Sequence, residues 1–192
     1  MALSAAIFLD KDGTLLVDVP YNVEPARMRF APRAAEGLAV LAQLGRPLIV
    51  VSNQPGIALG KFGYDDLYRM VGHLRLMFAE AGAELTAFLF CPHEAPLQSS
   101  VEACTCRKPA PGLLLEAAQR HAIDLSQSWM IGDILNDVEA GRRAGCTTVL
   151  INNGNETEWV PGPLRTPHYV VRDFLEAARC IMAFETSREA CE

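Results

Sequence analysis

Five short apolar runs, each ending at a polar residue, constrain the fold of this chain more than any other sequence feature. They cover residues 5–9, 47–51, 85–90, 129–131 and 147–151. Continuous apolar runs of this length are typical of strands in a parallel sheet that is covered on both faces. Because ligands bind at the carboxyl ends of such strands, the polar residues after the runs are expected to meet at one edge of the sheet.

Amphipathic helical patterns separate these runs. Apolar residues recur at three- and four-residue intervals in segments 34–42, 67–81, 113–118, 136–144 and 174–182. The alternation of strand and helix predicts an α/β fold with a doubly wound, Rossmann-like parallel sheet. With 192 residues, no linker and no repeat, the chain is expected to form one domain over residues 1–192.

Composition and net charge limit the classes of molecule that this chain is expected to bind. Hydrophobic residues make up 50% of the chain and charged residues 21%, as in ordinary soluble domains. The first apolar segment ends at Asp10 and lacks a basic flank, so it is interpreted as a strand and the protein as cytoplasmic. A net charge of −6 argues against a nucleic-acid binder. It does not exclude a phosphorylated substrate, and we expect no membrane association and a monomer.

Two carboxylates follow the first run, in Asp10-Lys11-Asp12-Gly13-Thr14. Gly13 permits a turn that lets Asp10 and Asp12 face one pocket. A carboxylate nucleophile divides phosphate-ester hydrolysis into two steps through an aspartyl phosphate. A second carboxylic acid can protonate the leaving oxygen and later deprotonate the attacking water. A pair of aspartates alone is also common in solvated turns and helix caps, whereas the longer run after a strand is more specific.

This run resembles motif I of the haloacid dehalogenase superfamily of phosphatases, and three other segments resemble the remaining motifs. Ser52 follows the second apolar run as in motif II, and Lys108 precedes a proline as in motif III. Asp133 follows Gly132 after the fourth run, as in motif IV. The superfamily has a Rossmann-like parallel sheet, which agrees with the fold expected from the apolar runs.

The resemblance implies a catalytic role for each matched residue. Asp10 is the expected nucleophile and Asp12 the acid and then the base. The hydroxyl of Ser52, with the N–H of Asn53, is expected to hold a phosphoryl oxygen, and Lys108 to offset negative charge.

The resemblance also implies a catalytic Mg²⁺ ion. Its expected ligands are the carboxylate of Asp10, the backbone carbonyl of Asp12, and Asp133, since Mg²⁺ prefers oxygen. For Asp137, a role beside these ligands, a helix-start role and a surface role remain open.

A second cluster combines Cys91 and His93 with Cys104 and Cys106. Three thiolates and one imidazole make a closed tetrahedral zinc set, so this Zn²⁺ would be structural. The alternative is three buried thiols and a surface histidine. Because Arg107 follows the last ligand and precedes Lys108, the ion is expected to order a loop that brings two cations to the phosphate.

The zinc loop and two further runs, 17–21 and 52–62, are similar to one nearly capless group within the superfamily. That group comprises the D-glycero-D-manno-heptose 1,7-bisphosphate phosphatases and the related histidinol-phosphate phosphatases. The resemblance implies a phosphomonoesterase acting on a small sugar phosphate, with the heptose bisphosphate losing its 7-phosphate. The implied substrate contacts are Asp18, Val19, Pro20, Tyr21, Ser52, Asn53, Gln54, Pro55, Arg107 and Lys108.

One position departs from the heptose group, which carries a basic residue directly after the motif IV aspartate. Here that residue is Ile134. Histidinol phosphate or another small metabolite is therefore an alternative substrate. An idle zinc-stabilised interaction module is the alternative from a different class, and the intact Asp10, Asp12, Lys108 and Asp133 argue against it.

Overall fold

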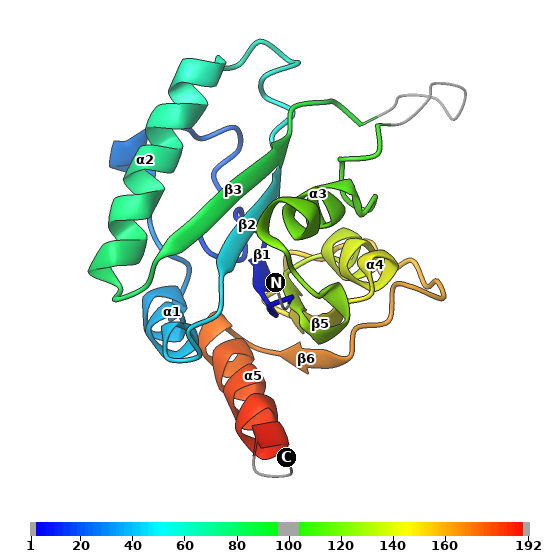
Figure 1. The fold of residues 1–192 in the computed structure, drawn as a ribbon. Coiled ribbons are helices and arrows are strands. Elements are labelled where there is room, and N and C mark those ends of the chain that lie inside the picture. Colours follow the sequence, from blue (N-terminus) through cyan, green and yellow to red (C-terminus); the bar gives the residue numbers. More distant parts are fainter. Residues whose placement is uncertain (1–2, 96–103, 190–192) are drawn as a thin grey trace.

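A parallel sheet lies at the centre of the computed structural model, which describes residues 3–95 and 104–189 (Figure 1). Its six strands in the described residues are β1 (Ile7–Leu9), β2 (Leu48–Asn53), β3 (Leu85–Cys91), β4 (Trp129–Gly132), β5 (Thr147–Ile151) and β6 (Tyr169–Val171). They lie in the order β3-β2-β1-β4-β5-β6, and every neighbouring pair is parallel. The topological switch point, where such sheets bind ligands, is therefore between β1 and β4.

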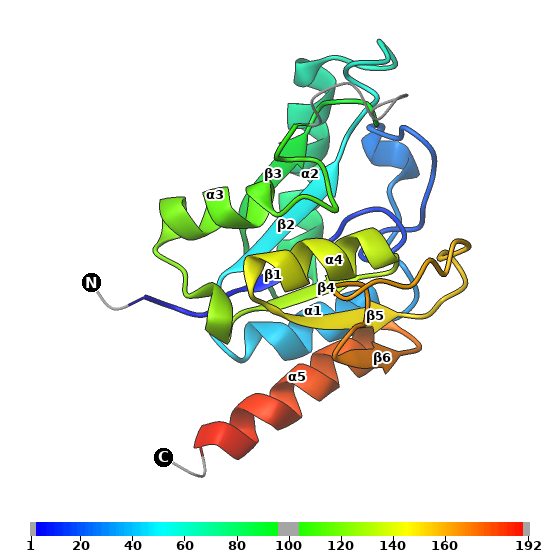
Figure 2. The ribbon, with the colours of Figure 1, turned by 90° about the vertical axis from the view of Figure 1, so that its right-hand side faces the viewer.

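Helices cover both faces of the sheet, as Figures 1 and 2 show together. They are α1 (Ala34–Ala42), α2 (Tyr64–Glu80), α3 (Gly112–His121), α4 (Leu135–Ala144) and α5 (Phe174–Glu189). Ile7 and Leu9 of β1 pack in the core with α1, α2 and α5, whereas Phe8 packs with α3 and α4. Burial on both faces explains why the strands appear in the sequence as continuous apolar runs.

The predicted α/β doubly wound sheet is confirmed, with two differences of detail. The edge strand β6 (Tyr169–Val171) was not predicted; it lies at the edge of the sheet, and its residues are only partly buried or exposed. The helix α5 continues to Glu189 rather than ending near residue 182. Among the described residues, none of the helices combines the length and apolar character that crossing a bilayer requires.

Within the described residues, the connections at the carboxyl edge of the sheet are loops. Between β1 and α1 the chain forms only a 3-10 turn, Pro25–Arg27, and is tied back by pairing of Leu16 with Phe30. This agrees with the capless prediction. The connection between β3 and α3 is described only outside residues 96–103, and Cys191 also lies outside the described residues.

Candidate active site and metal centres

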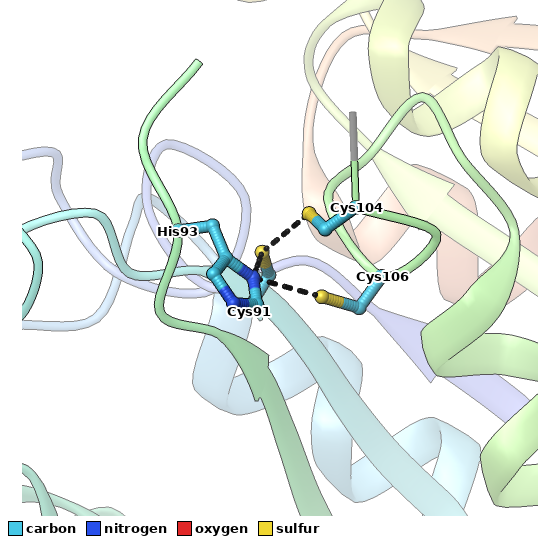
Figure 3. A group of neighbouring side chains, drawn as sticks. All are labelled: Cys91, His93, Cys104 and Cys106. Atoms are coloured by element: carbon cyan, nitrogen blue, oxygen red, sulfur yellow. Dashed lines mark hydrogen bonds between the residues drawn. The ribbon is translucent and has the colours of Figure 1, made fainter. Parts of the chain in front are cut away.

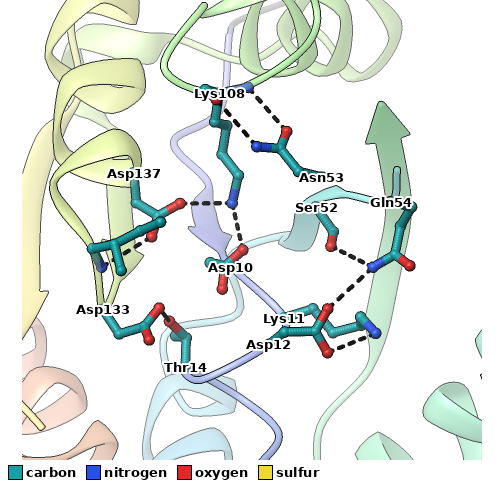
Figure 4. A network of polar contacts seen from close by, with 11 residues as sticks. Asp10, Lys11, Asp12, Thr14, Ser52, Asn53, Gln54, Lys108, Asp133 and Asp137 are labelled. Atoms are coloured by element: carbon teal, nitrogen blue, oxygen red, sulfur yellow. Dashed lines mark hydrogen bonds and ion pairs between the residues drawn. The ribbon is translucent and has the colours of Figure 1, made fainter. Parts of the chain in front are cut away.

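The carboxylate of Asp10 lies directly after β1, where the side chain of Lys108 reaches it from the loop before α3 (Figure 4). Lys108 donates a hydrogen bond to Oδ1 of Asp10, and its ammonium lies 2.6 Å from Oδ1 of Asp137. All three residues are buried. Burial acts to lower the pKa of Lys108, but the two carboxylates raise it, so the ammonium stays charged. The lysine therefore holds Asp10 in place and offsets negative charge.

The side chain of Asp12 has surroundings different from those of Asp10. Its Oδ1 lies 2.8 Å from the ammonium of Lys11, and its Oδ2 accepts a hydrogen bond of 3.2 Å from the amide of Gln54 (Figure 4). Burial raises the pKa of Asp12, although Lys11 acts to lower it. A raised pKa suits a carboxyl group that must carry a proton to a leaving oxygen. The two aspartates thus have separate electrostatic settings.

The buried residue Asp137 joins this network at the start of α4. Its Oδ2 accepts a hydrogen bond of 3.3 Å from the backbone N–H of Ile134, while Oδ1 faces Lys108. Only 1% of the residue is exposed, so the surface role left open by the sequence is wrong. Asp137 both caps the helix and fixes the lysine.

The acidic cluster of Asp10, Asp133 and Asp137 places one oxygen of each residue within 4.8 Å of the others. The nearby Lys108 offsets only part of this charge. Burial, with the charges of Asp10 and Asp137, raises the pKa of Asp133 to about 7. A divalent cation would relieve this crowding, and carboxylate oxygens suit a hard ion such as Mg²⁺. The donor set therefore fits the predicted ligands Asp10 and Asp133, with the backbone carbonyl of Asp12 as the other predicted ligand.

The raised pKa of Asp133 predicts that cation binding depends on pH. Below its pKa of about 7 the carboxyl holds a proton, which must leave before the oxygen can bind a metal. If one proton must leave Asp133 for each ion bound, the apparent Mg²⁺ affinity should be about ten-fold higher at about pH 8 than at about pH 6. Mg²⁺ titrations across this range, without substrate, measure the effect. An affinity independent of pH would contradict it.

A cavity of about 290 Å³ opens above these groups at the carboxyl edge of the sheet. Most of the predicted site residues line it: Asp10, Asp12, Asp18, Ser52, Asn53, Pro55, Arg107, Lys108 and Asp133. The buried Gln54 is not part of the lining, but its amide donates to Oγ of Ser52, which is, over 2.8 Å. Among the described residues, the predicted contacts Val19, Pro20 and Tyr21 are not part of the lining, so their role stays a prediction.

The side chain of Asn53 fixes the position of the loop that carries Lys108. Its Nδ2 donates to the backbone carbonyl of Lys108 over 3.1 Å, and its Oδ1 accepts from the backbone N–H of Lys108 over 3.0 Å (Figure 4). This pair of hydrogen bonds links the end of β2 to the loop before α3. Asn53 therefore positions the lysine, in addition to the predicted role of its own N–H toward phosphate.

The four predicted zinc ligands come together beside this loop (Figure 3). Nδ1 of His93 lies 3.4 Å from Sγ of Cys91 and 3.3 Å from Sγ of Cys106, and Cys91 and Cys104 are 3.6 Å apart. Donors of a tetrahedral zinc ion at its usual bond lengths are about 3.6–3.8 Å apart. The observed distances of 3.3–3.6 Å are slightly shorter, so the cluster is compatible with zinc. His93 is exposed, as in the alternative of buried thiols and a surface histidine, but its ring converges with the three thiols.

Several site residues received no role from the sequence. Lys11 pairs with Asp12, and the hydroxyl of Thr14 donates to Oδ1 of Asp133 over 2.9 Å. Both residues lie in motif I, which indicated that they are near the site. The motif did not indicate which side chains they contact. Asn155 lines the cavity from the loop after β5. A run of asparagines after the fifth apolar run was the only signal for it.

Comparisons with known proteins agree with this arrangement. A family model described as HAD-hydrolase-like matches residues 105–177. The D-glycero-beta-D-manno-heptose-1,7-bisphosphate 7-phosphatase of Mesorhizobium japonicum is 37% identical over 185 residues, covering 94% of this chain and 82% of that protein. The enzyme of the same name from Escherichia coli is 37% identical over 168 residues, covering 81% and 87%.

A solved structure resembles the fold closely. The crystal structure of D,D-heptose 1,7-bisphosphate phosphatase from B. bronchiseptica, complexed with magnesium and phosphate, has a TM-score of 0.80. It is 28% identical and covers 93% of this chain and 98% of that chain.

The strand order and the residues at the switch point define a hydrolase with a haloacid dehalogenase-like fold. The chain belongs to the haloacid dehalogenase-like phosphatases, in the family whose relatives include the heptose-1,7-bisphosphate 7-phosphatases. An enzyme is thereby favoured over the idle interaction module.

Proposed function

We propose that this chain is a Mg²⁺-dependent phosphomonoesterase that works through an aspartyl phosphate on Asp10. We further propose that it removes the 7-phosphate of D-glycero-D-manno-heptose 1,7-bisphosphate. Relatives with 31–37% identity bear the name of that activity. The contacts of Asp10 within the cavity carry the chemical part of the proposal.

The setting of Asp10 favours nucleophilic attack. In the described part of the chain, Lys108 is the hydrogen-bond donor to Oδ1, and Oδ2 receives no hydrogen bond. Oδ2 is thus available to attack phosphorus, while the ammonium of Lys108 offsets charge on the incoming phosphoryl group. The hydroxyl of Ser52 accepts a hydrogen bond from Gln54, so its own proton is free to donate to a phosphoryl oxygen.

Two proton transfers by Asp12 complete the reaction. As Asp10 forms its bond to phosphorus, the bond to the leaving oxygen breaks, and that oxygen takes the proton of Asp12. The ionised Asp12 then removes a proton from water, whose oxygen attacks the aspartyl phosphate and releases inorganic phosphate and the Asp10 carboxylate. The raised pKa of Asp12 suits the first transfer, and the nearby Lys11 stabilises its ionised form before the second.

Two metal ions belong to the proposal. Asp10, Asp133 and the carbonyl of Asp12 would hold Mg²⁺, which as a Lewis acid offsets charge on the phosphoryl oxygens. Cys91, His93 and the pair Cys104 and Cys106 would hold a structural Zn²⁺ ion. The second set leaves no open position for a substrate.

The apolar side chain of Ile134 favours a second candidate substrate class. Ile134 lines the cavity, at the position where the heptose group carries a basic residue. Arg107 also lines the cavity, and its planar fork can bind phosphate oxygens in pairs. The arginine supports a bisphosphate, whereas the isoleucine supports a substrate with one phosphate, such as histidinol phosphate.

A substrate panel tests the proposal. We expect Mg²⁺-dependent release of inorganic phosphate, with kcat/KM for a heptose 1,7-bisphosphate anomer at least about ten-fold above that for histidinol phosphate and hexose phosphates. A colorimetric phosphate assay with both anomers measures this. If histidinol phosphate is the better substrate, the heptose assignment is wrong while the phosphatase chemistry stands. If no phosphate ester is hydrolysed, the whole proposal is wrong.

A further inference from the structure

The loop after β5 connects the two segments that supply the acidic cluster. The amide of Asn153 donates to the backbone carbonyl of Gly13 over 2.8 Å, and its Oδ1 accepts from the N–H of Asn155 over 3.1 Å. Nδ2 of Asn155 donates to Oδ2 of Asp133 over 2.6 Å. The loop therefore contacts the turn after β1 and the residue after β4 at once.

One residue farther along, the same loop contacts the start of α4. Oε2 of Glu156 accepts a hydrogen bond of 2.6 Å from the backbone N–H of Leu135, one of the free N–H groups at a helix start. The backbone on each side of Asp133 is thus held, because the strand β4 precedes it and the capped helix follows. The amide of Asn155 adds a contact to the carboxylate itself.

The hydrogen bonds of Asp133 differ in charge from those of its neighbours. Asp10 and Asp137 both face the cation Lys108. Within the described residues, Asp133 instead accepts from two neutral donors, the hydroxyl of Thr14 on Oδ1 (Figure 4) and the amide of Asn155 on Oδ2. Neutral donors fix the orientation of a carboxylate without cancelling its charge. When Asp133 is ionised, no protein cation neutralises its charge within the described residues, so that charge is available to a metal cation.

Gly13 makes room for this contact. Its φ of +86° is readily adopted only by glycine, and a Cβ there would lie 2.1 Å from Oδ2 of Asp133 and 2.6 Å from Nδ2 of Asn155. The hydrogen bond between those two atoms therefore passes close over the backbone of Gly13. Glycine is therefore required at this position of motif I partly because a loop outside the motifs packs against it.

We propose that Asn155 is a positioning residue that orients the carboxylate of Asp133 for a divalent cation. Asn153 supports it by holding the loop against Gly13. This inference rests on the proposed Mg²⁺ site and adds to it a residue outside the four motifs. Partners that orient a metal ligand in this way typically change metal affinity ten- to a hundred-fold when removed.

Direct binding of Mn²⁺, a paramagnetic substitute for Mg²⁺, tests the role without substrate. The free ion is followed by electron paramagnetic resonance in wild-type protein, Asn155→Ala and Asn152→Ala. We expect the Kd of Asn155→Ala to rise at least about ten-fold. Asn152→Ala is the matched control from the same loop, because Asn152 is exposed and contacts β6 through its backbone N–H. Its Kd is expected to stay at the wild-type value.

A kinetic measurement separates positioning from general loosening of the structure. With an aryl phosphate, Asn155→Ala should need more Mg²⁺ for half-maximal rate but keep the wild-type KM at saturating Mg²⁺. Asn155→Gln, which retains an amide donor, should bind Mn²⁺ more tightly than Asn155→Ala. Equal weakening in both variants would assign the effect to the loop and overturn the inference.

The remaining outcomes distinguish this inference from the proposed function. Unchanged Mn²⁺ affinity in Asn155→Ala, with normal binding by the wild-type protein, would overturn the positioning role alone. Absence of Mn²⁺ binding and of Mg²⁺-dependent turnover in the wild-type protein would overturn the proposed function and the inference together.

Discussion

The variant Asp10→Asn is expected to lose at least about a thousand-fold in kcat while remaining folded. An amide cannot form the aspartyl phosphate, so the reaction would lose its two-step route. The fold should survive, because Lys108 still has the carboxylate of Asp137 within 2.6 Å. Phosphate release at saturating substrate and Mg²⁺ measures the loss, and circular dichroism with thermal unfolding checks the fold.

The variant Asp65→Asn is a matched control for this change. Asp65 is an exposed aspartate in the first turn of α2, on a helix that contributes nothing to the cavity lining. The Asp65→Asn variant loses one negative charge by the same change from carboxylate to amide, and its kcat should stay at the wild-type value. Full activity in Asp10→Asn would show that Asp10 is not the nucleophile, whatever activity the Asp65→Asn control has.

The sequence predicted the strands and helices whose residues all follow one hydrophobic pattern. Continuous apolar runs gave β2 and β5 because both faces of these strands are buried, and amphipathic spacing gave α2 and α4. The same rule placed Asp10 and Asp133 at one edge, since parallel strands end together. The cluster of Cys91 and His93 with the later cysteines was predictable because ligand chemistry restricts residue types strongly.

The remaining features depend on contacts between distant parts of the chain. Asn155 touches Asp133 only because the loop after β5 folds back over Gly13, and no local pattern encodes that path. The pairing of Asn53 with the backbone of Lys108 likewise joins residues 55 positions apart. The three-residue strand β6 is set by pairing with β5 rather than by its own sequence. The single-domain and monomer predictions stay predictions.

Removal of zinc is expected to lower kcat/KM at least about ten-fold and to lower the thermal unfolding midpoint, because metal binding and loop folding are coupled. Cys91 ends β3, and Cys106 directly precedes Arg107 and Lys108 in the chain. The ion would therefore link a core strand to the segment that supplies the cations of the site. Zinc content, thermal unfolding and phosphate release are measured on the same samples.

The design must separate the two metals, because a chelator also removes Mg²⁺. The zinc-free protein is freed of chelator and assayed with Mg²⁺ restored, and zinc is then added back to recover activity. Cys104→Ser should reproduce the loss permanently, whereas Cys180→Ser, which changes a partly buried cysteine in α5, should not.

The loss without zinc should affect substrate binding more than the position of Lys108. The side chain of Asn53 holds the backbone of Lys108 through two hydrogen bonds that do not involve the zinc ligands, so we expect the lysine to stay near Asp10. The loss should then appear mainly in KM, through Arg107, and native kinetics without zinc would show that the loop orders itself.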